Sequence, residues 1–341
     1  MLTLDRLQSF LARLPQLRIG LVGDLFLDRY LELAPGIREM SIETGLEAYQ
    51  ITRIRNAPGA LGTVLNNLAA LGVGRLIPVT VIGDDGHGYD LRRALESLPV
   101  DPRHIVSATD RLTPTYTKPL RRHDDGQVEE LNRLDVRDRQ PLSTATTALV
   151  CERIDSLWNE CDGLIVLDQI VETDWGVVNA TVRRHIGELA AKDPQKLVYV
   201  DSRAHLQSFS FGTLKGNRSE VTSAAGMPVE DDDATRRSLE ALTHRTGRLA
   251  FCTCGDQGIL VAEKPGVVHL VPGYRVSGPV DIVGAGDAAS SGIVTSLLAG
   301  ATSTEAAAVG NLVASITVQQ LGTTGTATPA QVEARWHDWK K

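Results

Sequence analysis

The sequence of 341 residues has few cysteines, no excess of basic residues and no long hydrophobic run. Its four cysteines, at positions 151, 161, 252 and 254, form no C-x-x-C pair, so we expect free thiols in a reducing compartment. Cys252 and Cys254 alternate along a predicted strand, but two thiols alone make no zinc site. The net charge of −7 argues against a nucleic-acid partner, which usually requires a basic surface. Any phosphate-binding site must therefore be local.

The sequence also contains no segment with the pattern of a membrane span or a signal peptide. The most apolar stretch, residues 306–318, is interrupted by Asn311, Ser315 and Thr317, and it falls short of the roughly 18 apolar residues that a membrane span needs. Residues 1–17 mix charged residues among leucines, which is typical of an amphipathic helix and not of a signal peptide. We expect a soluble cytoplasmic protein with no membrane partner.

Short apolar runs alternate with helical patterns along most of the chain. This alternation is the signature of βαβ units, so it predicts an α/β fold with a mostly parallel sheet and helices on both faces. With 42% hydrophobic residues and no internal repeat or low-complexity linker, residues 1–341 are interpreted as one domain. The predicted strands are residues 19–22, 76–82, 164–167, 197–200 and 249–253, and the predicted helices are residues 61–71, 89–98, 174–191, 230–245 and 288–298.

Two segments break the alternation, residues 28–56 and 114–135. Both are richer in charge and show strand-like alternation without intervening helices. They are expected to pair as a small sheet at one edge of the α/β domain, where a lid could exclude water from a reaction. A pair of surface hairpins with no such role is the alternative.

The most informative stretch is VDIVGAGDAA, residues 280–289. Gly284 and Gly286 let the backbone approach an anion closely, and the helix that follows offers free N–H groups and the positive end of its dipole. Asp287 then lies beside the bound charge. There a carboxylate can accept a proton from an alcohol that attacks a phosphoryl group.

Two other interpretations of this stretch remain open. Residues 284–289 also fit the G-x-G-x-x-A pattern of dinucleotide-binding proteins, but the acidic residue about 20 positions later, Glu305, opens an alanine-rich helix and does not close a second strand. A glycine-rich turn capped by Asp287 with no ligand is the other possibility.

Further motifs carry a family resemblance. They are residues 23–30 (GDLFLDRY), 58–67 (PGALGTVLNN), 115–118 (TYTK) and 131–135 (LNRLD). Together with the Gly-Ala-Gly-Asp turn, these motifs resemble the ribokinase-like carbohydrate kinases, the phosphofructokinase B family, over about residues 18–328. Within that family the chain looks most like the heptose 7-phosphate kinase half of bifunctional ADP-heptose synthase.

The resemblance implies a ribokinase-like fold with a β lid, and ATP-dependent phosphorylation of a sugar or sugar-phosphate hydroxyl, with heptose 7-phosphate at C1 as the first acceptor to try. It implies Asp287 as the base and the amides of Gly284, Ala285 and Gly286 as the anion hole. Asn217 and Glu220 match an Asn-x-x-Glu motif that helps hold Mg²⁺ through water. The acceptor site would include Asp24, Asp28, Gly59, Thr63, Asn67 and Lys118.

The resemblance also implies that the nucleotide binds to a turn and a pocket formed by residues in the C-terminal third of the chain. ATP and Mg²⁺ are the expected cofactors, and Asp281 belongs to a loop where some relatives bind a monovalent cation such as K⁺. The resemblance also implies a homodimer, in which a second chain could complete the edge sheet. The nucleotide-flanking residues would be Thr253, Gly255, Gly258, Asn311 and Gly322.

The chain departs from the family pattern at the acceptor side. Relatives usually have Gly-Gly followed by Asn where this chain has Gly59-Ala60 and Thr63, and only Asp168 is clearly kept from another heptose kinase motif at residues 167–172. The sugar is therefore less defined than the reaction. A catalytically weak sugar- or nucleotide-binding relative, a kinase for another sugar or a nucleoside, and a dehydrogenase remain alternatives. No His-x-Gly-His motif occurs, so we expect no nucleotidylyltransferase half.

Overall fold

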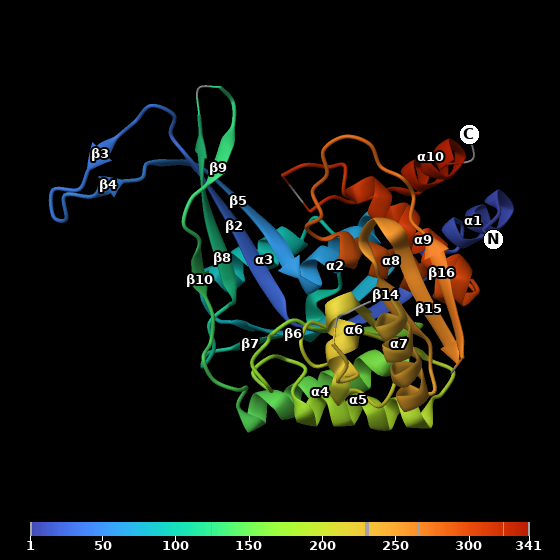
Figure 1. The fold of residues 1–341 in the computed structure, drawn as a ribbon. Coiled ribbons are helices and arrows are strands. Elements are labelled where there is room, and N and C mark those ends of the chain that lie inside the picture. The colour runs from blue at the N-terminus through green and yellow to red at the C-terminus, as the bar shows by residue number, and fades with distance from the viewer. Residues whose placement is uncertain (1, 124, 229–231, 265, 323, 340–341) are drawn as a thin grey trace.

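A nine-stranded sheet forms the centre of the computed structural model, which describes residues 2–123, 125–228, 232–264, 266–322 and 324–339 (Figure 1). Neighbours from β7 to β14 pair in parallel, and β15 and β16 are antiparallel, so the predicted mostly parallel sheet is confirmed. In sheet order the strands are β16 (Val267–Pro272), β15 (Gly258–Lys264), β14 (Ala250–Thr253), β13 (Thr213–Asn217), β12 (Leu197–Ser202), β11 (Gly163–Asp168), β1 (Arg18–Gly23), β6 (Arg75–Gly83) and β7 (Ile105–Ala108).

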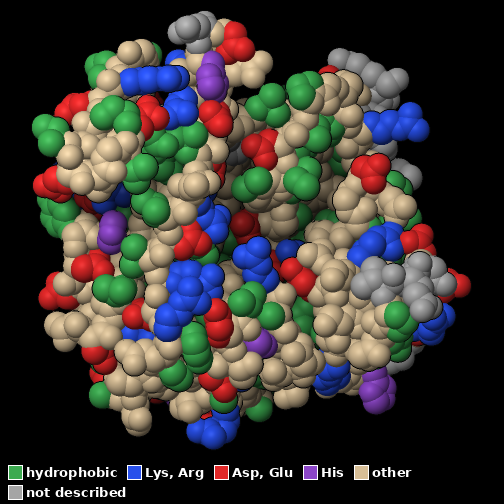
Figure 2. All heavy atoms as spheres, turned by 60° about the vertical axis from the view of Figure 1, so that its left-hand side comes forward, with side chains coloured by type: hydrophobic (Ala, Val, Ile, Leu, Met, Phe, Trp, Pro, Cys, Tyr) green, Lys and Arg blue, Asp and Glu red, His purple; other side chains and the backbone are tan. Residues whose placement is uncertain are grey.

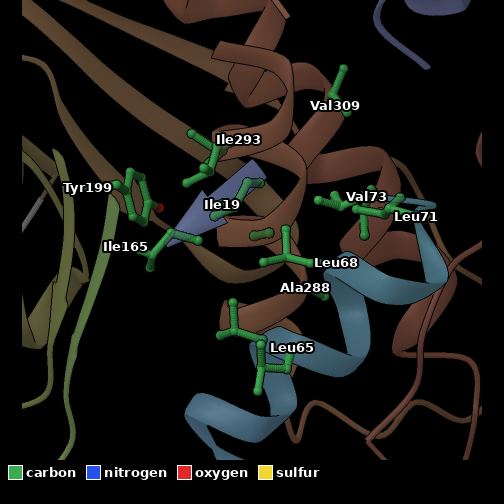
Figure 3. Packing of buried hydrophobic residues seen from close by; sticks show 14 of the residues in the cluster. Ile19, Leu65, Leu68, Leu71, Val73, Ile165, Tyr199, Ala288, Ile293 and Val309 are labelled. Carbon is green, nitrogen blue, oxygen red and sulfur yellow. The ribbon is translucent and has the colours of Figure 1, made fainter. Parts of the chain in front are cut away.

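Two hydrophobic clusters, one on each face of this sheet, show which helices cover which side. In Figure 3, Leu65 and Leu68 of α2 lie near Ala288 of α8 on one face. This packing brings the start of α2 and the start of α8 to the same region. On that face are α1 (Leu4–Leu11), α2 (Leu61–Ala70), α3 (Gly86–Leu95), α8 (Ala285–Leu298), α9 (Ser303–Thr317) and α10 (Pro329–Trp339), and on the other are α4 (Thr144–Glu160), α5 (Ala180–Lys192), α6 (Arg218–Ala224) and α7 (Asp232–Thr246).

A second sheet stands beside the main body, as Figure 1 shows. Its strands β2 and β8 pair in parallel, with Asp28 opposite Tyr116, so the two segments that break the α/β alternation do lie together. The short hairpin β3 (Glu39–Met40) and β4 (Glu47–Ala48) extends from it, away from the body (Figure 1). The strands of this second sheet are β2 (Leu25–Leu33), β5 (Ile51–Ala60), β8 (Thr115–Arg122), β9 (Val128–Glu130) and β10 (Leu134–Val136).

Several predicted boundaries were wrong for local reasons. The helix predicted from residue 174 begins only at Ala180, because the Asn179 side chain caps it by accepting hydrogen bonds from the amides of Thr181 and Val182. The helix predicted from residue 89 begins at Gly86, where the Asp85 side chain is the cap. The N-terminal helix ends at Leu11 and a 3-10 turn containing Pro15 follows. Of the helix predicted over 230–245, residues 230 and 231 lie outside the described residues.

Cys254 lies one residue beyond the end of β14, and its Sγ is 3.8 Å from that of Cys252. Both thiols are free and buried. No helix among the described residues is long and apolar enough to cross a membrane.

Candidate active site

Polar residues collect where neighbouring parallel strands end. Asp24 directly follows β1, Asp168 ends β11, Asp201 is near the end of β12, and Asn217 ends β13. These strands are adjacent and parallel, so their carboxyl ends lie along one edge of the sheet. Ligands of open α/β sheets bind at the carboxyl ends of the strands, so this edge is the candidate active site.

The glycine turn lies at this edge and opens α8. Gly284 has φ 79°, a left-handed conformation that favours glycine, and it is the residue before the helix. The amide of Ala285 donates to the carbonyl of Ile282 at 3.1 Å, so it is not available to an anion. Within the described part of the chain, the amides of Gly284, Gly286 and Asp287 have no acceptor. Of the three amides predicted for an anion hole, those of Gly284 and Gly286 are free among the described residues and that of Ala285 is not, and the Asp287 amide is free in its place.

Asp287 is half-buried in the first turn of α8. Burial raises its pKa from 3.8 to about 7, the Asp201 carboxylate adds to the increase, and Lys215 and Arg203 oppose it. No described side chain or amide donates a hydrogen bond to its carboxylate. A carboxylate with this pKa and free oxygens suits a general base near neutral pH.

The segment at residues 58–67 lies beside the glycine turn. A Cβ on Gly284 would lie 3.5 Å from the Cγ2 methyl of Thr63, so Thr63 at the start of α2 is beside the proposed anion hole. Ala60, which precedes this helix, keeps a glycine-like φ of 53°. Asn67 is fully buried, and its Nδ2 donates to the Thr63 carbonyl at 2.9 Å. Asn67 therefore supports α2 from inside, and its position does not favour the predicted contact with an acceptor.

Three of the predicted acceptor residues come together on the second sheet. Lys118 Nζ is 2.9 Å from Asp28 Oδ1 and 4.9 Å from the centre of the Tyr30 ring. Gly59 leaves room for this pair, because a Cβ there would lie 2.4 Å from Asp28 Oδ2. Figure 2 shows acidic and basic side chains around a hollow on the side of the molecule where this sheet comes forward. A sugar hydroxyl can donate a hydrogen bond to the carboxylate and accept one from the ammonium group beside it.

Asp24 differs from this group, since its carboxylate is already used. One oxygen accepts hydrogen bonds from the amides of Gln169 and Ile170, at 2.9 and 3.3 Å, and the other accepts one from Val177 at 2.8 Å. Its side chain therefore holds the loop after β11, which does not favour the predicted contact with the sugar. Burial, together with the charge of Asp24, raises the pKa of neighbouring Asp168 to about 7.

Asn217 and Glu220 form a capping box at the start of α6. Asn217 Oδ1 accepts from the Glu220 amide at 2.9 Å, and Glu220 Oε2 accepts from the Asn217 amide at 2.7 Å. Thr253 is opposite Asn217 in the sheet, so the predicted Mg²⁺ motif and the predicted nucleotide-flanking turn are neighbours. No group of three or more His, Cys, Asp or Glu side chains among the described residues could hold a metal ion. Glu220 Oε1 and the second lone pair of Asn217 Oδ1 are left over from the capping box, and they fit a Mg²⁺ ion that is bound mainly by phosphate and water.

The turn after β14 has two glycines with positive φ, 61° at Gly255 and 107° at Gly258. A Cβ on Gly258 would lie only 2.2 Å from the Val271 carbonyl oxygen, so the turn requires glycine there. The side-chain nitrogen of Asn311 donates to the carbonyls of Val271 and Pro272, at 3.0 and 3.1 Å. Asn311 therefore ties α9 to β16 beside this turn, and its amide nitrogen is not free for a base.

Asp281 and Gly322 are also joined. Asp281 accepts hydrogen bonds from the amides of Val283 and Gly322, both at 3.0 Å. Its carboxylate thus fixes the loop before α8 to the turn after α9, and it remains half-buried and negatively charged beside the glycine turn. Its oxygens are compatible with a cation, although backbone amides already use both of them.

Sequence reasoning missed a buried pair next to Asp287. Lys215 Nζ is 2.7 Å from Asp201 Oδ2, and Ser290 donates to the same oxygen at 3.2 Å. The available signal was weak: Asp201 follows a buried strand, and Lys215 lies two residues before the Asn-x-x-Glu motif. Only the pairing of β12 with β13 brings the two together.

A family model and curated relatives both match most of the chain. The model of the pfkB family carbohydrate kinases matches residues 47–331. The chain is 28% identical over 336 residues to Bifunctional protein HldE of Syntrophotalea carbinolica, covering 97% of the chain and 65% of that protein. It is 27% identical over 316 residues to Bifunctional protein HldE of Gluconacetobacter diazotrophicus, covering 92% and 62%. The chain thus spans less than two thirds of the length of these relatives.

Solved structures share the fold. Phosphofructokinase-2 from Escherichia coli in complex with potassium aligns with a TM-score of 0.71 at 17% identity, covering 95% of this chain and 100% of that one. Ribokinase from Arabidopsis thaliana, complexed with ribose and ATP, aligns with a TM-score of 0.65 at 16% identity, covering 94% and 98%. The ribokinase-like fold is therefore confirmed.

Proposed function

The chain belongs to the pfkB family of carbohydrate kinases, and on that premise we propose that it transfers the terminal phosphoryl group of ATP to a hydroxyl of a sugar phosphate. Family membership makes the protein a phosphotransferase that acts on a sugar. Heptose 7-phosphate, phosphorylated at C1, is the acceptor that we propose first, because the GDLFLDRY stretch at residues 23–30 resembles the heptose 7-phosphate kinases.

The observation that carries the proposal is Asp287 beside free amides at the start of α8. Asp287 accepts the proton of the attacking hydroxyl, which its raised pKa favours near neutral pH. The amides of Gly284, Gly286 and Asp287 bind the oxygens of the transferring phosphoryl group, and the helix dipole adds to their effect. These amides belong to the backbone at the start of α8, so their directions are set by the fold before the reaction begins.

The acceptor is held from the second sheet. Asp28 and Lys118 bind its hydroxyls, and Thr63 lies beside the glycine turn. Closing the sheet over the acceptor excludes water, which would otherwise compete as the nucleophile. Mg²⁺, bound with the triphosphate, supplies neutralisation of phosphate charge, and Asn217 and Glu220 would hold it through water.

We also propose a homodimer that involves the second sheet. The hairpin of β3 and β4 extends from the body in Figure 1 and exposes apolar side chains, among them Ile42 at 102% and Leu46 at 69% of full exposure. Exposed apolar residues on a projecting hairpin favour a partner chain. Sedimentation equilibrium measures the assembly, and a monomer at all concentrations would contradict it.

The test is ADP release from Mg·ATP with a panel of sugars, sugar phosphates and nucleosides that includes heptose 7-phosphate. Release that depends on heptose 7-phosphate supports the proposed acceptor, and release with another compound replaces it. A second candidate function is that of a sugar- or nucleotide-binding relative with little turnover. It is favoured by Ala60, which has a φ of 53° where relatives usually have glycine, and by Thr63, which stands where relatives usually have Asn. Silence across the panel, with ATP binding retained in calorimetry, would favour that candidate.

A further inference from the structure

A buried lysine and a buried aspartate lie directly behind the start of α8. Asp201 and Lys215 are opposite each other on adjacent strands, and each side chain is only 6% exposed. Side chains alternate along a strand, so Asp201 faces the same side as Tyr199. Figure 3 shows Tyr199 beside Ile165 and Ile293, on the face covered by α8. The pair therefore lies between the sheet and the helix that carries Asp287.

Lys215 reaches the glycine turn itself. Its Nζ lies 3.1 Å from the position that a Cβ on Gly286 would take, so the absence of a side chain at 286 makes room for the ammonium group. Within the described part of the chain, Asp201 Oδ2 is the one acceptor of this nitrogen. Two of its three N–H donors are therefore unpaired in a buried place, which costs free energy unless an anion arrives.

Asp201 connects the lysine to the helix of the base. Its Oδ2 accepts from Lys215 Nζ at 2.7 Å and from Ser290 Oγ at 3.2 Å. Ser290 lies one turn after Asp287 and accepts from the Tyr199 hydroxyl at 3.2 Å. The ammonium group is thus fixed relative to α8, as a preorganised charge must be.

We propose that Lys215 is a positioning residue of the phosphoryl-transfer site, whose fixed charge stabilises both the anion at the first amides of α8 and the ionised carboxylate of Asp287. Asp201 and Ser290 hold it in that place. This inference rests on the proposed function, since it assigns a further residue to the same site. A buried cation near the developing phosphate charge acts in a medium where electrostatic effects are large.

The charged groups that act on Asp287 are Asp201 on β12, Arg203 just after that strand, Lys215 on β13, and Glu220 on α6. The titratable but neutral Tyr199, on β12, is also nearby. After burial itself, Asp201 is the largest contributor that raises the pKa of Asp287, and Lys215 is the largest that lowers it. Removing the charge of Asp201 should therefore lower the pKa of Asp287, and removing the charge of Lys215 should raise it.

The experiment compares Lys215→Met, Asp201→Asn and the double variant with the wild-type protein. Lys215→Met leaves Asp201 as an unpaired buried charge and can destabilise the fold, whereas the double variant removes both charges together. We expect the double variant to unfold at a temperature near that of the wild type, with kcat reduced by about 100- to 1,000-fold and the KM for ATP little changed. A kcat restored to the wild-type level in the double variant would overturn the proposal, because the pair would then be purely structural.

The pH profile of kcat/KM gives a readout that a structural role would not move. The acid limb should shift to higher pH in Lys215→Met and to lower pH in Asp201→Asn; shifts in the same direction, or none, would overturn the proposal. Lys196→Met is the matched control, because Lys196 precedes the same strand, β12, at its opposite end and donates to the Cys161 carbonyl at 3.0 Å. It should keep wild-type kcat.

Failure of the inference can be told apart from failure of the proposed function. If Asp287→Asn is inactive while the double variant turns over normally, only the role of Lys215 is wrong. If Asp287→Asn keeps full activity, the assignment of the base is wrong, whatever the lysine variants do.

Discussion

Turnover should fall steeply as the pH drops below about 7, because the proposed base must be ionised to accept a proton. Burial, with the charge of Asp201 as the next contributor, raises the pKa of Asp287 from 3.8 to about 7. Below its pKa, the ionised fraction of a group falls about tenfold for each pH unit. With a pKa of about 7, kcat/KM should therefore decrease about tenfold between pH 8 and pH 6.

The assay is ADP release with saturating Mg·ATP and limiting acceptor, over roughly pH 5 to 8.5. The phosphate of a sugar phosphate titrates near pH 6, so it can imitate a protein group. Asp201→Asn separates the two, because it lowers the pKa of Asp287 and cannot change the titration of the acceptor. A rate that stays flat from pH 5 to 8 would mean that Asp287 ionises at its ordinary pKa, and it would refute the reasoning.

Three further predictions concern stability and acceptor binding. Asp287→Asn should raise the free energy of unfolding at pH 8 by at most about 4 kcal/mol, because a carboxyl whose pKa is raised in the folded state destabilises the fold when it is ionised. This increase in stability should disappear as the pH falls from about 7 to 4, and thermal unfolding at several pH values measures it. Ala60→Gly should raise the free energy of unfolding by about 1 kcal/mol because it relieves a φ of 53°, and a loss in denaturant titration would show that the methyl group packs usefully. Lys118→Met should raise the KM for the acceptor by about 10- to 100-fold and leave the KM for ATP unchanged; an equal rise in both would remove Lys118 from the acceptor site.

Much of the fold follows from local patterns in the sequence. The run at residues 164–167 predicts a strand buried on both faces, and all six residues of β11 are indeed buried. Segments 28–56 and 114–135 lack helical periodicity, and they form strands of the second sheet. The start of α5 was missed because an apolar pattern does not show that Asn179 will act as a cap.

The candidate site was harder to predict, because its geometry depends on pairs that are distant in the chain. The Gly-Ala-Gly-Asp motif identified the glycine turn, but not that the Ala285 amide is used by Ile282. Asp24, Asn67 and Asn311 fit family motifs, yet the Asp24 carboxylate and the side-chain nitrogens of Asn67 and Asn311 make hydrogen bonds within the fold. The pair of Lys215 and Asp201 depends on strand register, which no single motif encodes.

The most direct test of the central claim is the kcat of Asp287→Asn, measured as acceptor-dependent ADP release at pH 8 with ATP affinity determined in parallel. The substitution removes the base and little volume, so the account predicts that kcat falls by at least about 100-fold while ATP binds as in the wild type. An Asp287→Asn protein that turns over at the wild-type rate would contradict the account.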